Sequence, residues 1–212
     1  MIYAINSNGI RVSASPEQEA ICPVCNQKLI PKCGDIKIWH FAHAISEECD
    51  SFSEHESEWH INWKNRFDKS QREYIIEKAG ERHIADIFVD GLIVELQHSP
   101  ISPIEISIRE RFYENMIWIF DLNDKYKEGH LSYKIKPFLY LNDPCQNKVW
   151  WHIKWMSQIY REITKPLFFD FGKGLIRVKE IDDFGGGTGY FYGYPFIQGN
   201  IKYYANKKRS IK

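Results

Sequence analysis

Two acidic residues occupy the middle of a predicted β-hairpin, where apolar side chains would be expected. The segment HIADIFVDGLIVELQHS, residues 83–99, contains two strand-like runs that meet at Asp90 and Gly91. An Asp-Gly pair between such runs is a strong signal for a two-residue hairpin turn. This turn pairs Asp86 directly with Glu95. The two Cβ atoms would then be roughly 5 Å apart, where like charges repel by about 1–3 kcal/mol.

The facing acids need a compensating group. Side chains two positions apart on a strand share a face, so Gln97 lies beside Glu95 on the face that carries Asp86. Polar groups on a partly apolar face are stabilised by hydrogen bonds, a shared proton or a cation. A hard divalent ion between the two carboxylates is the most economical explanation, since Mg²⁺ prefers oxygen ligands. The alternative is an edge hairpin whose acids are solvated or paired with Lys or Arg.

Four of the five cysteines lie in a short N-terminal segment together with two histidines. The motif CPVC places two cysteines on a tight knuckle, and the motif HFAH has the same two-residue gap. If a helix begins near Trp39, its two histidines lie on one face of the first turn. The pattern predicts a structural zinc site, because four protein ligands leave no open position for a catalytic water. The predicted ligands are Cys22, Cys25, His40 and His43.

Two further cysteines compete as zinc ligands. Cys49 could replace either histidine, and Cys33 is a weaker candidate. The competing interpretation makes HFAH an ordinary helix surface and the cysteines buried thiols. An odd number of cysteines without a recognisable secretion signal argues against a disulfide framework. Because so short a segment has little core of its own, the metal would supply much of its folding free energy.

Composition excludes several classes of protein. The chain of 212 residues contains 28 Lys and Arg against 28 Asp and Glu, so its net charge is zero. This balance argues against strong nonspecific attraction to nucleic acid but leaves room for a local basic groove. A hydrophobic content of 43% with 15% aromatic residues predicts a packed core. No apolar run approaches the roughly 18 residues of a membrane span, and the N-terminus lacks signal-peptide features. We therefore expect a cytoplasmic protein that does not associate with membranes.

Helices and strands are predicted on both sides of the hairpin. EHESEWHINWKNRF has helical character, and Glu56, His60 and Lys64 share one face of it. A polar stripe of this kind is usually solvated, whereas the parallel stripe of tryptophans and phenylalanine is expected to pack in the core. REYIIEKAG predicts a strand before the hairpin. A helix starting at Ser102-Pro103 and the strand MIWIFDL follow it. The predicted order is helix, three strands, helix, strand.

Taken together and in this order, these motifs resemble the competence protein CoiA-like family over roughly residues 1–122. The resemblance rests on CPVC, HFAH followed by Cys49, HESEWHINWK, ADIFV, IVELQHSPIS, and RERFY followed by IWIFDL. It implies an α+β or α/β fold with a zinc-finger-like module over residues 1–50. A PD-(D/E)xK nuclease core of the E-x-Q version is implied for residues 51–125, with a restriction-endonuclease-like order αβββαβ. Residues 126–212 would then form an accessory helix and a β-rich extension.

The resemblance assigns catalytic roles to Glu56, Asp86, Glu95 and Gln97. Asp86 and Glu95 would bind one or two Mg²⁺ or Mn²⁺ ions, and Glu56 on the first helix could complete the coordination. The metal would polarise the scissile phosphate and lower the pKa of its bound water. Gln97 stands where related nucleases have lysine, and it can only orient water or phosphate by hydrogen bonds.

Four further residues are implied to bind the substrate: His60, Lys64, Arg109 and Tyr113. Lys64, His60 or Arg109 could supply the positive charge that Gln97 lacks. The partner would be single- or double-stranded DNA, with a recombination or defence protein as a further partner. Two alternatives stay open. One is a catalytically inactive DNA-binding or recombination accessory protein, and the other is a zinc-stabilised protein-interaction module.

The C-terminal part lies mostly outside the resemblance. WWHIKWMSQIYREITKP, residues 150–166, is predicted to form an amphipathic helix that ends at Pro166. LFFDFGKGLIRVKEI predicts a hairpin, and the glycines at 185–187 predict a flexible loop. The chain ends with aromatic residues interleaved with Lys and Arg. Such a sequence could stack on bases and neutralise phosphates, although an aromatic β extension packed on the core is the simpler interpretation.

Overall fold

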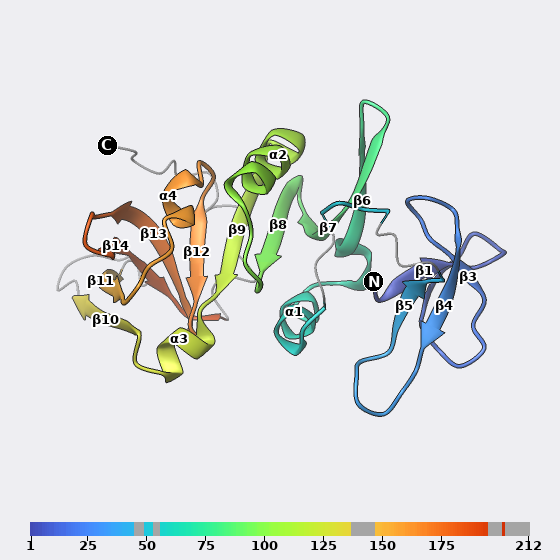
Figure 1. Cartoon of the computed structure of the whole chain (residues 1–212), viewed down its shortest axis with the longest axis horizontal. Coiled ribbons are helices and arrows are strands. Elements are labelled where there is room, and N and C mark those ends of the chain that lie inside the picture. The colour runs from blue at the N-terminus through green and yellow to red at the C-terminus, as the bar shows by residue number, and fades with distance from the viewer. Residues whose placement is uncertain (45–48, 53–55, 137–146, 195–200, 202–212) are drawn as a thin grey trace. The chain divides into compact units, whose positions relative to one another are not determined.

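The computed structural model describes residues 1–44, 49–52, 56–136, 147–194 and 201. It shows a mixed α+β protein, which confirms that fold class (Figure 1). The chain divides into two compact units, Met1–Phe88 and Val89–Lys212. Within the described residues, no helix has the length and apolar character needed to cross a membrane.

The first unit begins with a small antiparallel sheet in the strand order β2-β1-β3-β4-β5. Its strands are β1 (Tyr3–Ile5), β2 (Arg11–Ser13), β3 (Ala20–Ile21), β4 (Lys28–Lys32) and β5 (His40–His43). The turn between β1 and β2 contains Gly9 at a φ of 73°, a conformation that favours glycine. Six buried side chains form the core beneath this sheet: Ala4, Ala14, Ala20, Cys22, Leu29 and Phe41. Three of the six are alanines, so little apolar area is buried here.

The helix predicted to begin near Trp39 is wrong, because residues 40–43 form strand β5. Phe41 pairs with Pro31 on β4 and is buried in the small core. Successive side chains of a strand point to opposite faces, so residues three apart do not share a face. His40 and His43 therefore cannot act as a pair in the way that a helix would have allowed.

The rest of the first unit contains α1 (Glu58–Lys64), the 3-10 turn η1 (Lys69–Gln71), β6 (Arg72–Lys78) and β7 (Glu81–Val89). Helix α1 starts at its N-cap Ser57, whose side-chain oxygen accepts a hydrogen bond from the backbone N–H of His60. Trp63 and Phe67 are buried, as expected of the apolar stripe. Strands β6 and β7 pair in antiparallel fashion, with Tyr74 opposite Ala85.

The strands of the second unit follow the order β10-β11-β14-β13-β12-β9-β8. They are β8 (Leu92–Gln97), β9 (Met116–Asp121), β10 (Leu131–Lys136), β11 (Asn147–Ile153), β12 (Leu167–Asp170), β13 (Leu175–Ile181) and β14 (Gly186–Tyr192). Strand β9 pairs in parallel with both β8 and β12. Every residue of β8 is buried, as expected of a parallel strand covered on both faces.

The helices α2 (Pro103–Tyr113), α3 (Asn123–Lys127) and α4 (Ile159–Glu162) lie in the described part of the second unit. Helix α2 begins where the sequence predicts, because Ser102 caps its N-terminus and Pro103 occupies its first turn. It connects the parallel strands β8 and β9. Along residues 58–121 the chain forms α1, β6, β7, β8, α2 and β9 in turn. A restriction-endonuclease-like arrangement of these elements stays a prediction, as do domain boundaries after residues 50 and 125.

The amphipathic helix predicted for residues 150–166 is wrong. Trp151 and Ile153 are buried on β11, whereas Trp150 and His152 are exposed. This alternation has the period of two that a half-buried strand requires, and only α4 is helical in this segment. The hairpin predicted for residues 167–181 is confirmed as β12 and β13.

Of the glycines predicted to form a flexible loop, Gly186 and Gly187 instead begin strand β14, and Gly185 lies in the turn before it. A Cβ atom on Gly187 would lie 2.0 Å from the carbonyl oxygen of Glu180 on the paired strand. These glycines therefore allow close strand approach. Most of the aromatic and basic C-terminal tail lies outside the described residues.

Candidate functional site

Three cysteines and one histidine converge in the first unit to form what we call the cysteine cluster: Cys22, Cys25, His43 and Cys49. Their donor atoms all lie within 4.8 Å of one another. The Sγ atoms of Cys22 and Cys49 are 3.5 Å apart, and Cys25 Sγ is 3.3 Å from His43 Nε2. Tetrahedral ligands with zinc bonds of about 2.0–2.3 Å lie about 3.3–3.8 Å from each other. The cysteine cluster therefore fits a structural zinc ion.

The CPVC knuckle has the local geometry that directs two thiols toward one ion. Cys22 directly follows β3, and its Sγ accepts a hydrogen bond from the backbone N–H of Val24 at 3.4 Å. The N–H of Asn26 donates to the Cys22 carbonyl at 2.9 Å, and Asn26 adopts a φ of 61°. The chain thus reverses immediately after Cys25, so both sulfur atoms stay on the same side.

Cys49, the alternative ligand, takes the position that the sequence assigned to His40. His40 is not part of the cysteine cluster, and its Nδ1 lies 2.8 Å from the carbonyl oxygen of Ile38. Cys33 also lies outside the cluster. The predicted Cys2His2 set is therefore corrected to a Cys3His set, because β5 directs only His43 to the side of the knuckle.

Burial makes the thiolates of Cys22 and Cys49 unfavourable without a cation. Burial raises the pKa of Cys22. Burial together with the neighbouring thiols of Cys22 and Cys25 raises the pKa of Cys49. A divalent cation would reverse this effect, since metal binding stabilises the deprotonated ligands.

A second group of ionisable side chains, which we call the acid cluster, surrounds Lys64 on α1. The Lys64 Nζ atom contacts a carboxylate oxygen of Glu56 and lies 3.4 Å from Glu73 Oε1 and 3.0 Å from Asp86 Oδ1. Lys64 and Glu73 are buried, and Glu56 and Asp86 are largely so. One ammonium and three carboxylates sum to a charge of −2 when all four are ionised. The sequence stripe of Glu56, His60 and Lys64 thus faces the interior and is not a solvated face.

The pKa values of the residues in the acid cluster are shifted in different directions. Burial lowers the pKa of Lys64, but the carboxylates of Asp86, Glu73 and Glu56 outweigh it and raise that pKa overall. Burial raises the pKa of Glu56, with Glu73 and Asp86 adding to the effect and Lys64 opposing it. Burial also raises the pKa of Glu73, but Lys64 and two backbone N–H groups help to outweigh it, so that pKa is lowered overall. Of Glu56 and Glu73, Glu56 is therefore the acid that takes up a proton more readily.

Glu73 was not predicted as a site residue. Its carboxylate accepts hydrogen bonds from the backbone N–H groups of Ile2 at 2.9 Å and Tyr3 at 3.0 Å, so it fixes β1 to β6. The available signal was an acid within the apolar run REYII, which is the same signal that singled out Asp86 and Glu95. Glu73 also adopts a φ of 43°, which is uncommon for a residue other than glycine.

The segment that carries Cys49 is attached to the strand that carries Asp86. Asp50 Oδ1 lies 2.7 Å from His83 Nδ1, and Asp50 Oδ2 accepts a hydrogen bond from the N–H of Ile84 at 2.8 Å. The ring of Phe52 stacks on His83 with centroids 3.6 Å apart. The cysteine cluster and the acid cluster are thus linked through β7.

The predicted site residues of the second unit lie on β8 and α2. Arg109 Nη1 donates to Glu95 Oε2 at 3.2 Å, and both side chains are buried. Gln97 Nε2 donates to the carbonyl oxygen of Ser99 at 2.9 Å. The Gln97 Oε1 atom is buried and has no hydrogen-bond partner among the residues that the structure describes. Tyr113 is buried on the same helix as Arg109.

Asp86 and Glu95 belong to different units, and their facing positions stay a prediction. Each acid has a cationic partner in its own unit, Lys64 for Asp86 and Arg109 for Glu95. Asp90 and Gly91 adopt φ values of 50° and 81°, the positive values that a two-residue hairpin turn requires.

His60 has a structural partner at the start of α1. Its Nδ1 accepts a hydrogen bond from the backbone N–H of Ser57 at 3.2 Å, which completes a reciprocal cap. The ring is buried. The substrate-binding roles predicted for His60, Lys64, Arg109 and Tyr113 stay predictions.

These observations define a mixed α+β protein whose N-terminal sheet carries a Cys3His cluster suited to structural zinc. Residues 10–52 match the family model described as "Competence protein CoiA, N-terminal domain". That segment contains all four members of the cysteine cluster. The resemblance to the CoiA-like family predicted from the sequence is confirmed for this segment. No curated protein and no solved structure matches the chain.

Proposed function

We propose that this protein is a metal-dependent nuclease that acts on DNA, in DNA uptake and recombination or in defence. The observation that carries the proposal is the acid cluster, in which three carboxylates converge on the Lys64 ammonium. Several carboxylates gathered in a largely buried site favour a divalent cation. The name of the matched family model, a competence protein, supports a role in handling incoming DNA.

The donor set fits a hard cation. Glu56 Oε2 is buried and has no hydrogen-bond partner within the described part of the chain, and carboxylate oxygens are the ligands that Mg²⁺ and Mn²⁺ prefer. Asp86, Glu95 and Glu56 would hold the ion, and the proximity of Asp86 to Glu95 rests on the hairpin register predicted from the sequence. When bound, such an ion polarises a phosphodiester and lowers the pKa of its bound water. The cysteine cluster has the separate, structural role.

The protein's own cations complement this site. Lys64 keeps its proton beside Asp86 because the three carboxylates raise its pKa. Arg109 likewise holds a positive charge beside Glu95. These two side chains can supply the charge that a lysine at position 97 would carry. Gln97 contributes a buried amide oxygen able to accept a hydrogen bond from water.

A catalytically inactive DNA-binding or recombination accessory protein is the second candidate. The ion pairs Lys64–Asp86 and Arg109–Glu95 favour it, because each neutralises a predicted metal ligand. In this alternative the pairs are permanent structural contacts, and Mg²⁺ does not displace them.

Cleavage assays separate these two functions. The native protein is expected to cleave single- or double-stranded DNA when Mg²⁺ or Mn²⁺ is added. Asp86→Ala and Glu95→Ala are each expected to lower the rate at least about 100-fold, because each removes a ligand of the ion that would stabilise negative charge at the reacting phosphate. Asp124→Ala is the matched control, since Asp124 is an exposed acid on α3 paired with Lys127.

Three results would contradict the nuclease. Equal cleavage by all four proteins would assign the activity to a contaminant or another site. Binding of DNA without cleavage by the native protein would establish the inactive accessory protein. The absence of any DNA binding at low salt would favour a zinc-stabilised protein-interaction module.

A further inference from the structure

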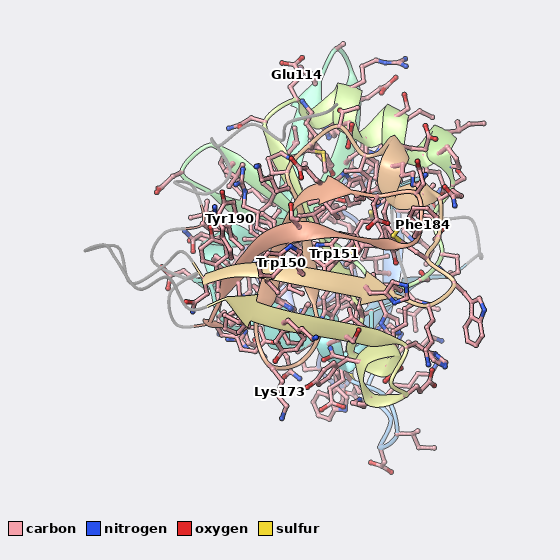
Figure 2. The ribbon with its side chains drawn as sticks, turned by 90° about the vertical axis from the view of Figure 1, so that its left-hand side faces the viewer. Glu114, Trp150, Trp151, Lys173, Phe184 and Tyr190 are labelled. Carbon is pink, nitrogen blue, oxygen red and sulfur yellow. The ribbon has the colours of Figure 1, made fainter. Side chains whose placement is uncertain are left out.

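One face of the sheet in the second unit combines exposed aromatic and basic side chains. Lys148, Trp150 and His152 alternate along β11 and share the exposed face, about 6.6 Å apart from one to the next. Lys134 on β10 pairs with Trp150, and Tyr190 on β14 pairs with Lys148. Figure 2 shows this face toward the viewer, with Trp150 and Tyr190 over neighbouring strands. Trp150 is 48% exposed, although it is the kind of side chain that folding usually buries.

A pocket of about 360 Å³ lies where β11 ends. Its volume falls within the range of small-ligand sites. Two very exposed aromatic side chains line it, Trp155 at 80% and Phe184 at 88%. Lys154, Arg161 and His152 also line it. Figure 2 labels Phe184 near one end of the strands that carry Trp150 and Tyr190.

Trp155 is held in a strained conformation that exposes its indole ring. Its φ is 52°, an outlier for a bulky side chain. Such a backbone conformation costs free energy and is often found at functional sites. The ring lies edge-on to His130, with centroids 5.0 Å apart, and the Lys154 N–H donates to the His130 carbonyl at 2.8 Å. The backbone is thus fixed in a form that directs a large apolar surface outward.

The turn that carries Phe184 is also fixed. Asp182 Oδ1 accepts hydrogen bonds from the N–H groups of Phe184 at 2.8 Å and Gly186 at 2.9 Å. Gly185 has a φ of 87°, and a Cβ atom there would lie 2.9 Å from the carbonyl oxygen of Ile153. The glycine therefore lets the turn approach the end of β11 closely. Trp155 and Phe184 line one rigid pocket as a result.

The charge on this surface is positive. Two acids at its border are paired, Asp183 with Arg161 at 3.2 Å and Glu180 with Lys179 at 3.6 Å. Lys134, Lys148 and Lys154 add positive charge to this surface. Exposed aromatic rings between lysines match a ligand that has flat bases and an anionic backbone.

We propose that this surface, which we call the aromatic surface and define by Lys148, Trp150, Lys154, Trp155 and Phe184, binds single-stranded DNA. Unpaired bases stack on Trp155 and Phe184, and the lysines neutralise phosphates. A duplex keeps its bases stacked on one another, so it cannot use the rings. The inference deepens the proposed function by naming the form of DNA, and it rests on that function for the choice of DNA as ligand.

A binding titration tests the aromatic surface without requiring cleavage. A fluorescently labelled oligothymidylate is titrated with the native protein in buffer without added Mg²⁺ or Mn²⁺. Trp155→Ala and Phe184→Ala are each expected to weaken binding at least about fivefold. Lys154→Ala is expected to lower the slope of log affinity against log salt by about 0.7. Trp39→Ala, which removes a half-exposed tryptophan from the first unit, is the matched control and should bind as the native protein does.

Equal affinity of the native protein, Trp155→Ala and Phe184→Ala would overturn the proposal, provided that their melting temperatures agree. Duplex DNA that binds as tightly as the oligothymidylate and responds equally to both substitutions would also overturn it. The failure of the nuclease is distinguishable. A protein that binds through Trp155 but never cleaves retains the aromatic surface, whereas cleavage without any effect of Trp155 retains only the nuclease.

Discussion

Removal of zinc is expected to unfold the N-terminal sheet. Its core consists of six buried side chains, three of which are alanines. Structural zinc in small modules contributes about 10–16 kcal/mol of apparent binding free energy near pH 7, which exceeds what such a core can replace. We therefore expect one zinc ion per chain in the purified protein by atomic absorption. A strong chelator should abolish the β signal of this sheet in circular dichroism and make residues 1–52 sensitive to protease.

The effect of zinc removal should extend to α1, β6 and β7. Glu73 on β6 is hydrogen-bonded to the start of the N-terminal sheet, and Asp50, next to Cys49, is hydrogen-bonded to β7. Loss of the sheet leaves Glu73 without its backbone donors and the Ile84 N–H without its acceptor, which is unfavourable. Proteolysis of the chelated protein should therefore also reach the segment 56–88, and a protected segment would show that the sheet folds independently.

Ligand substitutions identify the four zinc ligands. Cys49→Ala and His43→Ala are expected to lower the zinc content and the melting temperature. His40→Ala and Cys33→Ala are the matched controls and should retain stoichiometric zinc, because neither residue belongs to the cysteine cluster. Zinc lost from His40→Ala but kept by Cys49→Ala would restore the Cys2His2 set. Native protein without zinc would contradict the site altogether.

Lys64→Met is expected to destabilise the first unit by about 3–5 kcal/mol, the usual effect of removing one partner from a buried ion pair. Methionine keeps a long apolar stem but leaves three carboxylates without their ammonium. Urea denaturation measures the change. Lys28→Met is the matched control and should cause no measurable change, because Lys28 pairs with Glu19 on the open surface.

The destabilisation by Lys64→Met should depend on pH. In the native protein the raised pKa of Lys64 gives stability that is fully present below its ordinary pKa and lost only as the pH rises through the folded value. The lowered pKa of Glu73 gives stability that is present above its ordinary pKa and lost as the pH falls through the folded value. Without Lys64 the pKa values of Glu56 and Glu73 rise, because Lys64 lowers both, so protonation stabilises the variant in acid. The deficit should be largest near neutral pH and shrink on acidification, whereas a constant deficit would assign it to lost packing.

Local signals in the sequence predicted many of the elements, and distant partners decided the rest. The Ser102 cap and the Asp90-Gly91 turn are short-range features, and both are present. The sequence predicts a helix that begins near Trp39 and another over residues 150–166. In both segments the order of polar and apolar residues also fits the two-residue period of a strand. β11 forms a strand because it pairs with β10 and β14, and no local sequence pattern reveals this pairing.

The same division holds for the functional residues. Cys22, Cys25 and His43 follow from spacing, whereas the choice of Cys49 over His40 depends on which face β5 presents. Helical spacing predicts Glu56 and Lys64 on one face of a helix, but α1 begins at Glu58, so Glu56 precedes the helix. The contact of Lys64 with Glu73 and the pair Arg109–Glu95 depend on how elements pack, so neither could be read from the sequence.

The central claim is that Asp86 and Glu95 together bind a divalent ion. Anomalous diffraction from a crystal soaked in Mn²⁺ tests it most directly. We predict a manganese peak within bonding distance of carboxylate oxygens from both residues, with their Lys64 and Arg109 ion pairs opened. No peak at saturating Mn²⁺, with both ion pairs intact, would contradict the claim.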